Sequence, residues 1–208
     1  MKTNLRTLVS LAAALGASTF ALRAAPLAFD FKDPKGVNNV IFKLDAPLEA
    51  INGTGTGITG LITFDPATPG TTTGRIDLAV ASLKVGNPMM SEHLLGAMWL
   101  DAANHPTISF EATKLANVKT DGDKTTADVT GKLTVKGVTK ELTVPVSFTY
   151  HAGKLGARVQ NAKGDLLVVR TAFQIKRSDF GINAGKMDDK VSETIDLTLS
   201  LAGAAPTA

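Results

Sequence analysis

Residues 128–148, DVTGKLTVKGVTKELTVPVSF, decide the fold class of this chain. Apolar and polar residues alternate on both sides of Lys136-Gly137, and a period of two is typical of a β-strand with one buried face. A two-residue loop that contains glycine, placed between two such runs, predicts a β-hairpin. In the register that this loop sets, the apolar faces of the two strands largely coincide. The opposed residues are Val135 and Val138, Leu133 and Lys140, and Gly131 and Leu142.

The same alternation recurs along the chain and predicts eight strands, each with one apolar face. The apolar positions group within residues 40–44, 58–64, 76–80, 108–110, 129–135, 142–148, 169–175 and 195–201. Such strands bury their apolar faces in a sandwich or in a closed antiparallel barrel. Strands of about ten residues span roughly 33 Å, and this length favours the barrel. Pro145 has no N–H to donate, so it indicates a sheet edge or a bulge at that point.

The first 24 residues have the pattern of a secretory signal peptide. Lys2 and Arg6 precede a short apolar run at residues 8–15, and small residues follow. That run is shorter than the ~20 apolar residues that span a bilayer, although an uncleaved membrane anchor is the alternative. We expect cleavage after Ala24, which leaves residues 25–208 as one domain in the periplasm or outside the cell. Such compartments permit disulfides, yet the chain contains no cysteine.

The basic character of the chain belongs to the expected leader. The sequence holds 22 basic and 19 acidic residues, and Lys2, Arg6 and Arg23 lie in the leader, which has no acidic residue. Residues 25–208 therefore carry 19 residues of each sign. Because nucleic-acid binding favours clustered lysine and arginine, we expect no nucleic-acid partner.

Two short motifs resemble known signatures but lack their context. Gly55, Gly57 and Gly60 match the GxGxxG pattern, but a strand follows them where a dinucleotide site needs a helix. We interpret these glycines as letting a bent strand pass close to a neighbour, or as leaving room on its inner face. Residues 179–181 read DFG without any other kinase motif, so Gly181 indicates a turn.

Catalytic and metal-binding patterns are missing from the sequence. The three histidines, His93, His105 and His151, do not have the spacing of metal ligands. The chain has neither cysteine nor a GxSxG elbow, and the pair Asp188-Asp189 is interpreted as solvated loop charge. We therefore expect no enzyme activity, no cofactor and no metal site.

Residues 88–106, PMMSEHLLGAMWLDAANHP, are the one segment with a helical pattern. We expect a helix over residues 91–101 with Ser91 as its N-cap. Apolar side chains recur at helical spacing: Met90, Leu94, Leu95, Met98 and Trp99. The segment either plugs the end of the barrel as core or forms a pliable wall of a ligand cavity, a role that the flexible methionine side chain suits.

Three segments together resemble the YceI-like proteins, a family of secreted or periplasmic lipid-binding proteins. They are SEHLLGAMWLDAANHPTISFEA (91–112), DVTGKLTVKGVTKELTVPVSF (128–148) and FQIKRSDFGI (173–182), and the resemblance spans about residues 36–202. It implies an all-β fold, a lipocalin-like extended antiparallel eight-stranded barrel with a short helix alongside. Many members carry a histidine before the first barrel strand and another after it, where this chain has Val-Asn-Asn at 37–39 and Asp-Ala-Pro at 45–47.

The resemblance and the apolar strand faces lead to one functional expectation. The protein binds and shields or carries an amphipathic lipid, namely a polyisoprenoid, an isoprenoid quinone or a fatty-acyl chain, in a barrel cavity. The candidate lining residues are Phe42, Phe64, Leu78, Phe110, Phe148 and Phe173 from the strands, and Leu94, Met98 and Trp99 from the helix. Lys176 or Arg177 is a candidate for contact with a charged head group. The alternative is a filled barrel that acts as an interaction or stress-related structural module, and a homodimer remains open.

Overall fold

The hairpin that the sequence predicts forms part of the barrel wall in the computed structural model, which describes residues 26–207. β8 (Lys124–Val135) and β9 (Val138–His151) are joined by Lys136 and Gly137, whose φ angles are 49° and 77°. Positive φ at both loop positions is the type I′ geometry that suits the twist of a two-residue hairpin. Val135 pairs with Val138, and the predicted register is confirmed along both strands.

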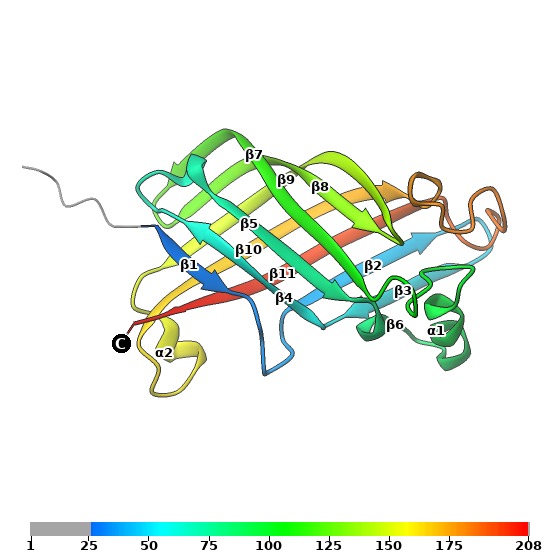
Figure 1. Ribbon diagram of the computed structural model, residues 1–208, viewed down its shortest axis with the longest axis horizontal. Helices are drawn as coiled ribbons and strands as arrows, with labels where there is room; N and C mark the ends of the chain where they lie inside the picture. The colour runs from blue at the N-terminus through cyan, green and yellow to red at the C-terminus, as the bar shows by residue number, and fades with distance from the viewer. Residues whose placement is uncertain (1–25, 208) are drawn as a thin grey trace, which may run out of the picture.

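Eight strand lines close into one antiparallel barrel (Figure 1). The other strands are β1 (Leu27–Asp30), β2 (Asn39–Asp45), β3 (Ala50–Gly55), β4 (Ile58–Phe64), β5 (Thr73–Ala79), β6 (Lys84–Val85), β7 (Thr107–Asp121), β10 (Gly164–Lys176) and β11 (Thr194–Pro206). The neighbours run β1-β4-β5-β7-β8-β9-β10-β11, and β11 pairs back onto β1. β2, β3 and β6 continue β1, β4 and β5, respectively, in the same direction around the wall. The strands therefore occupy eight positions around the barrel. The barrel and all eight expected strands are thereby confirmed, whereas β1, β3 and β6 were not predicted.

Asn38 bridges the interruption between β1 and β2. β11 pairs with β1 on one side of Ala202 and with β2 on the other. In between, the buried Asn38 side chain donates to the carbonyls of Ala202 and Phe31 at 3.1 and 3.0 Å, and it accepts the Ala202 N–H at 2.8 Å. The side-chain amide thus replaces a rung of the ladder and satisfies buried backbone groups. The stretch Val-Asn-Asn at 37–39 therefore has a structural role through Asn38.

Pro145 marks the point where β9 separates from β10. The ladder between these strands covers Val146–His151 and Leu166–Thr171 and ends there. The Thr171 hydroxyl donates to the Pro145 carbonyl at 2.7 Å, beside that last rung. The missing N–H of proline therefore faces a side of β9 that has no ladder partner, as the sequence predicts.

One end of the barrel is filled with side chains. Those buried there include Phe29, Phe31, Phe64, Leu155 and Leu167. The short helix α2 (Leu155–Arg158) packs against β10 and β11 at this end, where the C-terminus also lies (Figure 1).

The only tyrosine of the chain adds a polar tie at the filled end. The Tyr150 hydroxyl donates to Asp165 Oδ2 at 2.6 Å. Burial and the neighbouring Asp165 carboxylate raise the pKa of Tyr150 to about 12, because both disfavour the phenolate.

The helix of the methionine-rich segment lies earlier than expected. α1 spans Pro88–Leu95, and its N-cap is Asn87, whose side chain accepts the N–H groups of Met89 and Met90 at 2.9 and 3.3 Å. Pro88 begins the helix, because proline suits the first helical position, where its N–H would have no partner anyway. The helix ends at Gly96, so the expected span of 91–101 is wrong. Ser91 instead ties α1 to β6 through two hydrogen bonds of 3.1 Å with the Val85 backbone.

Three 3-10 turns complete the elements: η1 (Pro69–Thr71), η2 (Val80–Ser82) and η3 (Ser178–Phe180). Among residues 26–207, no helix combines the length and apolar character needed to span a membrane. The expected signal peptide, residues 1–24, lies outside the described residues.

Candidate ligand-binding cavity

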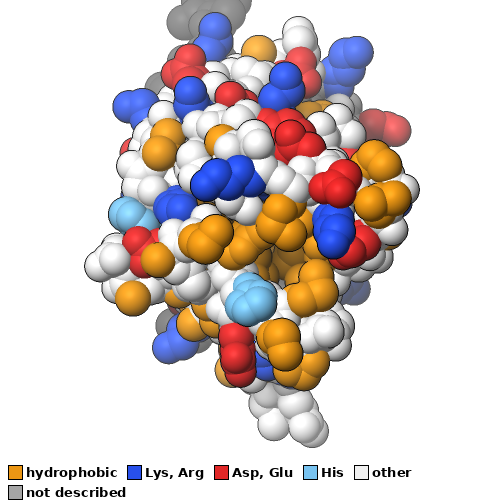
Figure 2. Space-filling model, turned by 90° about the vertical axis from the view of Figure 1, so that its right-hand side faces the viewer, with side chains coloured by type: hydrophobic (Ala, Val, Ile, Leu, Met, Phe, Trp, Pro, Cys, Tyr) orange, Lys and Arg blue, Asp and Glu red, His pale blue; other side chains and the backbone are white. Residues whose placement is uncertain are grey.

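A cavity of about 950 Å³ occupies the end of the barrel opposite α2. Figure 2 shows this end of the molecule, with a hollow at its centre that hydrophobic side chains surround. Pockets for small molecules span ~300–1,000 Å³, so this one is large. If a methylene group takes the ~30 Å³ that a water molecule takes in the liquid, the space holds roughly 30 carbon atoms. The interior of the barrel is therefore open at one end and filled at the other.

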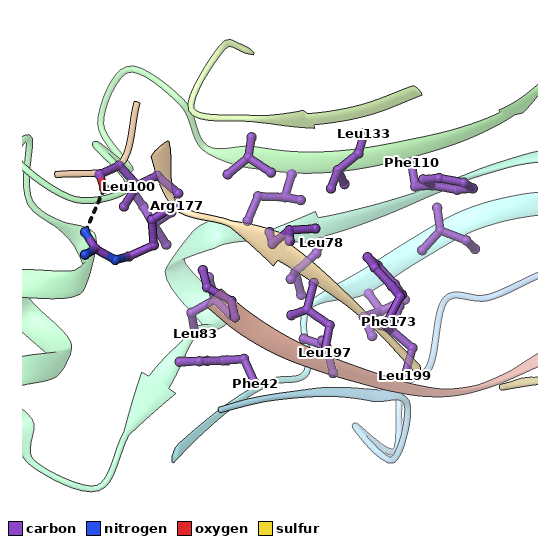
Figure 3. Close-up of a pocket in the computed structure, with 18 of the residues that line it drawn as sticks. Phe42, Leu78, Leu83, Leu100, Phe110, Leu133, Phe173, Arg177, Leu197 and Leu199 are labelled. Carbon is purple, nitrogen blue, oxygen red and sulfur yellow. Dashed lines mark hydrogen bonds between the residues drawn. The ribbon is translucent and has the colours of Figure 1, made fainter. Parts of the chain in front are cut away.

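Eight of the nine residues that the sequence singled out line this cavity: Phe42, Leu78, Leu94, Met98, Trp99, Phe110, Phe148 and Phe173. Figure 3 shows Phe42, Leu78, Phe110 and Phe173 around a common space, together with Leu197 and Leu199 of β11. The strand alternation places them on the inner face, and α1 with the turns after it supplies the remainder. Their contact with a ligand stays a prediction.

Phe64 is the exception, because it does not line the cavity. Its ring packs against Phe148 and Tyr150, with ring centroids 5.8 and 6.2 Å apart. The alternation of β4 places Phe64 on the inner face, as the sequence predicts. That position lies in the filled end, however, where neighbouring rings occupy the space in front of it. Phe148 contacts both this packed cluster and the cavity.

Two aromatic side chains of the wall lie across glycines of neighbouring strands. Gly53 is directly opposite Phe42 in the β2–β3 pair, and a Cβ atom on Gly53 would overlap the Phe42 ring. A Cβ atom on Gly131 would likewise overlap the ring of Phe110. Because the glycines have no side chain, each ring lies along the barrel wall instead of filling the centre. Gly55 and Gly57 also leave room for close neighbours, which fits their structural interpretation.

Three segments frame the mouth of the cavity. They are the β2–β3 turn (46–49), α1 with the turns after it (88–101), and the segment that joins β10 to β11 (177–193). The polar or methionine side chains that they add to the lining are Glu49, Met90, Glu92, His93, Met98, Arg177, Met187 and Lys190. The Leu48 N–H donates to the Asp189 carbonyl at 3.0 Å and so connects the β2–β3 turn to segment 177–193. Lys136 Nζ donates to the Met98 carbonyl at 3.4 Å, which places the tip of the β8–β9 hairpin beside the segment 88–101.

Segment 177–193 is folded around the guanidinium group of Arg177, which is 1 % exposed. The group donates to the Asp188 carboxylate at 2.7 Å and lies 5.9 Å from the centroid of the Trp99 ring. Its other acceptors are the carbonyls of Ile182, Asn183, Lys186, Val191 and Ser192. These contacts use the five donors of the guanidinium group.

Neither candidate for a charged head group is placed to hold one. Arg177 lines the cavity, but its donors are already bound within segment 177–193. Figure 3 draws one of these hydrogen bonds as a dashed line. Lys176 is exposed and does not line the cavity. Asp188, interpreted as a solvated loop charge, is 58 % exposed, and its carboxylate also pairs with Arg177.

Glu193 closes the base of the same segment. Its carboxylate accepts the hydroxyl and the N–H of Ser178, and Arg177 lies 3.9 Å away. The hydrogen bond from the Ser178 hydroxyl, supported by the Ser178 N–H and the charge of Arg177, holds the pKa of Glu193 below its ordinary value, although burial acts in the opposite direction. The carboxylate is therefore charged at neutral pH and helps to join the two ends of the segment.

Sequence reasoning missed the part of the wall that segment 177–193 supplies. Its lining residues are Ile182, Met187, Lys190 and Val191. They follow neither the helical nor the strand period, so periodicity could not find them. The only signal was the stretch FQIKRSDFGI (173–182), which carries part of the family resemblance and ends at Ile182. Within residues 26–207, no cluster of three or more potential ligand residues is arranged to hold a metal ion. The chemistry that this site offers is apolar binding.

Comparisons with known proteins agree with this fold. Residues 35–202 match the model of the YceI-like domain. The UPF0312 protein of Pseudomonas putida is 33% identical over 153 residues, which cover 74% of this chain and 73% of that protein. The UPF0312 protein of Azotobacter vinelandii is 30% identical over 151 residues, covering 73% and 72% of the two chains.

Two solved structures share the architecture. BcnA of Burkholderia cenocepacia superposes with a TM-score of 0.64 at 27% identity, covering 79% of this chain and 95% of that one. A domain of Saccharophagus degradans, described as a polyisoprenoid-binding domain implicated in plant cell wall breakdown, has a TM-score of 0.62 at 14% identity and covers 86% and 99%. The second likeness shows the fold alone. With its barrel, its cavity and the match over residues 35–202, the chain belongs to the YceI-like family.

Proposed function

We propose that this protein binds the hydrocarbon chain of an amphipathic lipid in the barrel cavity and shields or carries that lipid in the cell envelope. The observation that carries the proposal is an apolar cavity of about 950 Å³ that opens at one end of the barrel. Burying a hydrocarbon chain contributes about 0.8 kcal/mol per methylene group. A chain of a dozen or more carbon atoms therefore outweighs much of the free energy lost on association.

The class of ligand follows from the shape and polarity of the site. The strands supply mainly apolar side chains, whereas the ionisable side chains Glu49, Glu92, His93, Arg177 and Lys190 lie on the segments that frame the mouth. This arrangement suits a ligand with a long apolar tail and a polar head group near the mouth. A polyisoprenoid, an isoprenoid quinone and a fatty-acyl chain all fit that description. The name of the Saccharophagus degradans domain, which shares the fold, supports the first of them.

Location in the envelope is part of the same proposal. The signal-like pattern of residues 1–24 supports it, and an aqueous compartment between membranes is where a lipid chain needs shielding. The alternative of a filled barrel without a ligand requires an interior that side chains occupy throughout, and the cavity does not fit that requirement.

The test combines lipid extraction with a variant that fills the cavity. The purified protein is extracted with organic solvent and the extract is analysed by mass spectrometry; we expect a long-chain lipid in near-stoichiometric amount. The delipidated protein is then titrated with a fluorescent fatty acid. Ala112 lines the cavity, so Ala112→Phe should weaken binding at least tenfold, because a phenyl ring displaces several methylene groups at about 0.8 kcal/mol each.

The matched control is Ala172→Phe, since Ala172 is exposed on β10 and does not line the cavity. We expect this variant to bind like the wild type. Absence of both an extracted lipid and fatty-acid binding in the wild type would refute the proposed function. Equal binding by Ala112→Phe and the wild type would show that the lipid does not occupy this cavity.

A further inference from the structure

The mouth of the cavity is surrounded by exposed apolar side chains. Residues 26–207 contain nine exposed large hydrophobic residues, and five of them lie on the segments at the mouth or on the hairpin tip beside it. We call these five the mouth rim: Leu48, Met89, Met98, Val138 and Met187. Soluble proteins seldom gather exposed apolar side chains in one place unless that surface binds a partner or a membrane.

The mouth rim is continuous with the inner wall of the cavity. Met98 and Met187 are 65 % and 50 % exposed, and both also line the cavity. An apolar surface therefore runs from the barrel interior onto the outside of the molecule, as the side chains around the hollow in Figure 2 illustrate. A chain that leaves the cavity passes over these side chains before it reaches the surroundings.

The charge around the mouth rim points to an electrically neutral partner. Residues 46–49, 88–101, 136–137 and 177–193 together carry seven acidic and four basic side chains. This end of the protein has a slight negative excess, so it has no electrostatic attraction to an anionic membrane surface, which basic clusters recognise. Apolar contact is the interaction that remains.

The identity of the rim side chains suits a partner whose surface has no fixed shape, such as a bilayer. Three of the five are methionine, whose unbranched side chain adapts to irregular apolar surroundings. Protein interfaces instead concentrate binding energy in fixed tryptophan, tyrosine and arginine anchors. Here the only tryptophan and Arg177 belong to the cavity wall, so neither is presented outward as an anchor.

We propose that the mouth rim docks onto the surface of a zwitterionic lipid bilayer, so that the ligand chain passes between bilayer and cavity without crossing water. The inference rests on the proposed function. Passage through water would expose the apolar chain to solvent, which is unfavourable in proportion to the area exposed, and direct contact between the rim and the bilayer removes that barrier. The partner of this surface is thus the lipid interface itself.

The test measures transfer of a fluorescent fatty acid from loaded full-length protein to phosphatidylcholine vesicles that contain a quencher. Docking predicts a transfer rate that rises in proportion to vesicle concentration. The informative variant is Leu48→Gln/Met89→Gln, because these two residues belong to the rim, are 68 % and 65 % exposed and do not line the cavity. We expect about tenfold slower transfer, since two apolar contacts with the bilayer are lost, and unchanged affinity for the fatty acid in the absence of vesicles.

The matched control is Ile41→Gln/Leu61→Gln, which removes two apolar side chains that are 48 % and 58 % exposed on the outer barrel wall. Its transfer rate should stay within about twofold of the wild type. A rate independent of vesicle concentration, or equal slowing in both double variants, would overturn the docking proposal. So would transfer that requires anionic vesicles or an added protein. A wild-type protein that binds no fatty acid would instead refute the proposed function, and the two failures are thereby distinguished.

Discussion

Glycines 53 and 131 shape the cavity together with the aromatic residues that cover them. In a barrel of eight strands, the side chains of the inner face are enough to fill the interior. Here Phe42 and Phe110 occupy the places that the missing glycine side chains leave free on neighbouring strands. The largest side chains of the wall therefore take little of the central space, and room for a ligand remains.

Gly53→Ala tests this arrangement. The added Cβ atom overlaps the Phe42 ring and lies 2.6 Å from the backbone oxygen of Lys84, which is not free to move. We expect the free energy of unfolding, measured by urea denaturation, to fall by about 1–3 kcal/mol, as is typical of overpacking. Gly86→Ala is the control, because an added Cβ atom there meets nothing within 4 Å. It should leave stability unchanged or raise it by about 0.4–1 kcal/mol; equal losses in both variants would contradict the argument.

Among the elements, segment 177–193 depends most on a single side chain. Apart from η3 it has no regular structure, so its backbone carbonyls cannot all pair with one another. Arg177 satisfies five of these carbonyls and one carboxylate. One side of the cavity wall is therefore held in place by one buried guanidinium group.

Arg177→Lys keeps the positive charge but replaces a planar fork of five donors with three donors at one point. Several buried carbonyls then lose their partner at about 1–3 kcal/mol each. We expect the free energy of unfolding to fall by about 3 kcal/mol and amide hydrogen exchange to accelerate within residues 178–193. Lys176→Arg, at the exposed neighbouring position, should change neither quantity. Unaltered exchange in segment 177–193 of Arg177→Lys would show that another interaction holds it.

At the scale of the whole molecule, the barrel has one filled end and one hollow end. Aromatic and aliphatic side chains pack the end near α2, whereas a bound chain would supply the missing core at the other. A ligand that binds only the folded state stabilises it according to its concentration. If the proposed ligand occupies the cavity, the stability of this protein is expected to depend on the concentration of that ligand.

Thermal unfolding of delipidated and reloaded protein measures this dependence. A ligand at a hundred times its Kd adds about 2.7 kcal/mol, and for a domain of this size that raises the Tm by roughly 5–10 °C. Ala112→Phe should show a much smaller increase at the same ligand concentration, whereas Ala172→Phe should respond like the wild type. A Tm that does not change in the presence of a ligand that demonstrably binds would contradict a position inside the barrel.

The sequence by itself determined eight of the strands, the hairpin register and the inward residues of those strands. These features are local: the side-chain period of a strand is two, and a two-residue turn with glycine sets the pairing of its neighbours. That is why the register of Val135 and Val138 and the eight strands could be predicted. The start of α1 was missed even though its signal is also local. Asn87 followed by Pro88 is a typical helix N-terminus, but serine is also common at the N-cap, and the prediction placed the N-cap at Ser91.

Only the tertiary structure decided which inner-face residues border empty space. Phe64 and Phe148 both point inward, yet Phe64 packs in the filled end and Phe148 reaches the cavity. Alternation states the direction of a side chain but not what lies in front of it, which depends on residues far apart in sequence. The acceptors of Arg177 and the residues of the mouth rim also depend on the tertiary structure. Each is assembled from backbone and side chains that only the closure of the barrel and the folding of its connecting segments bring together.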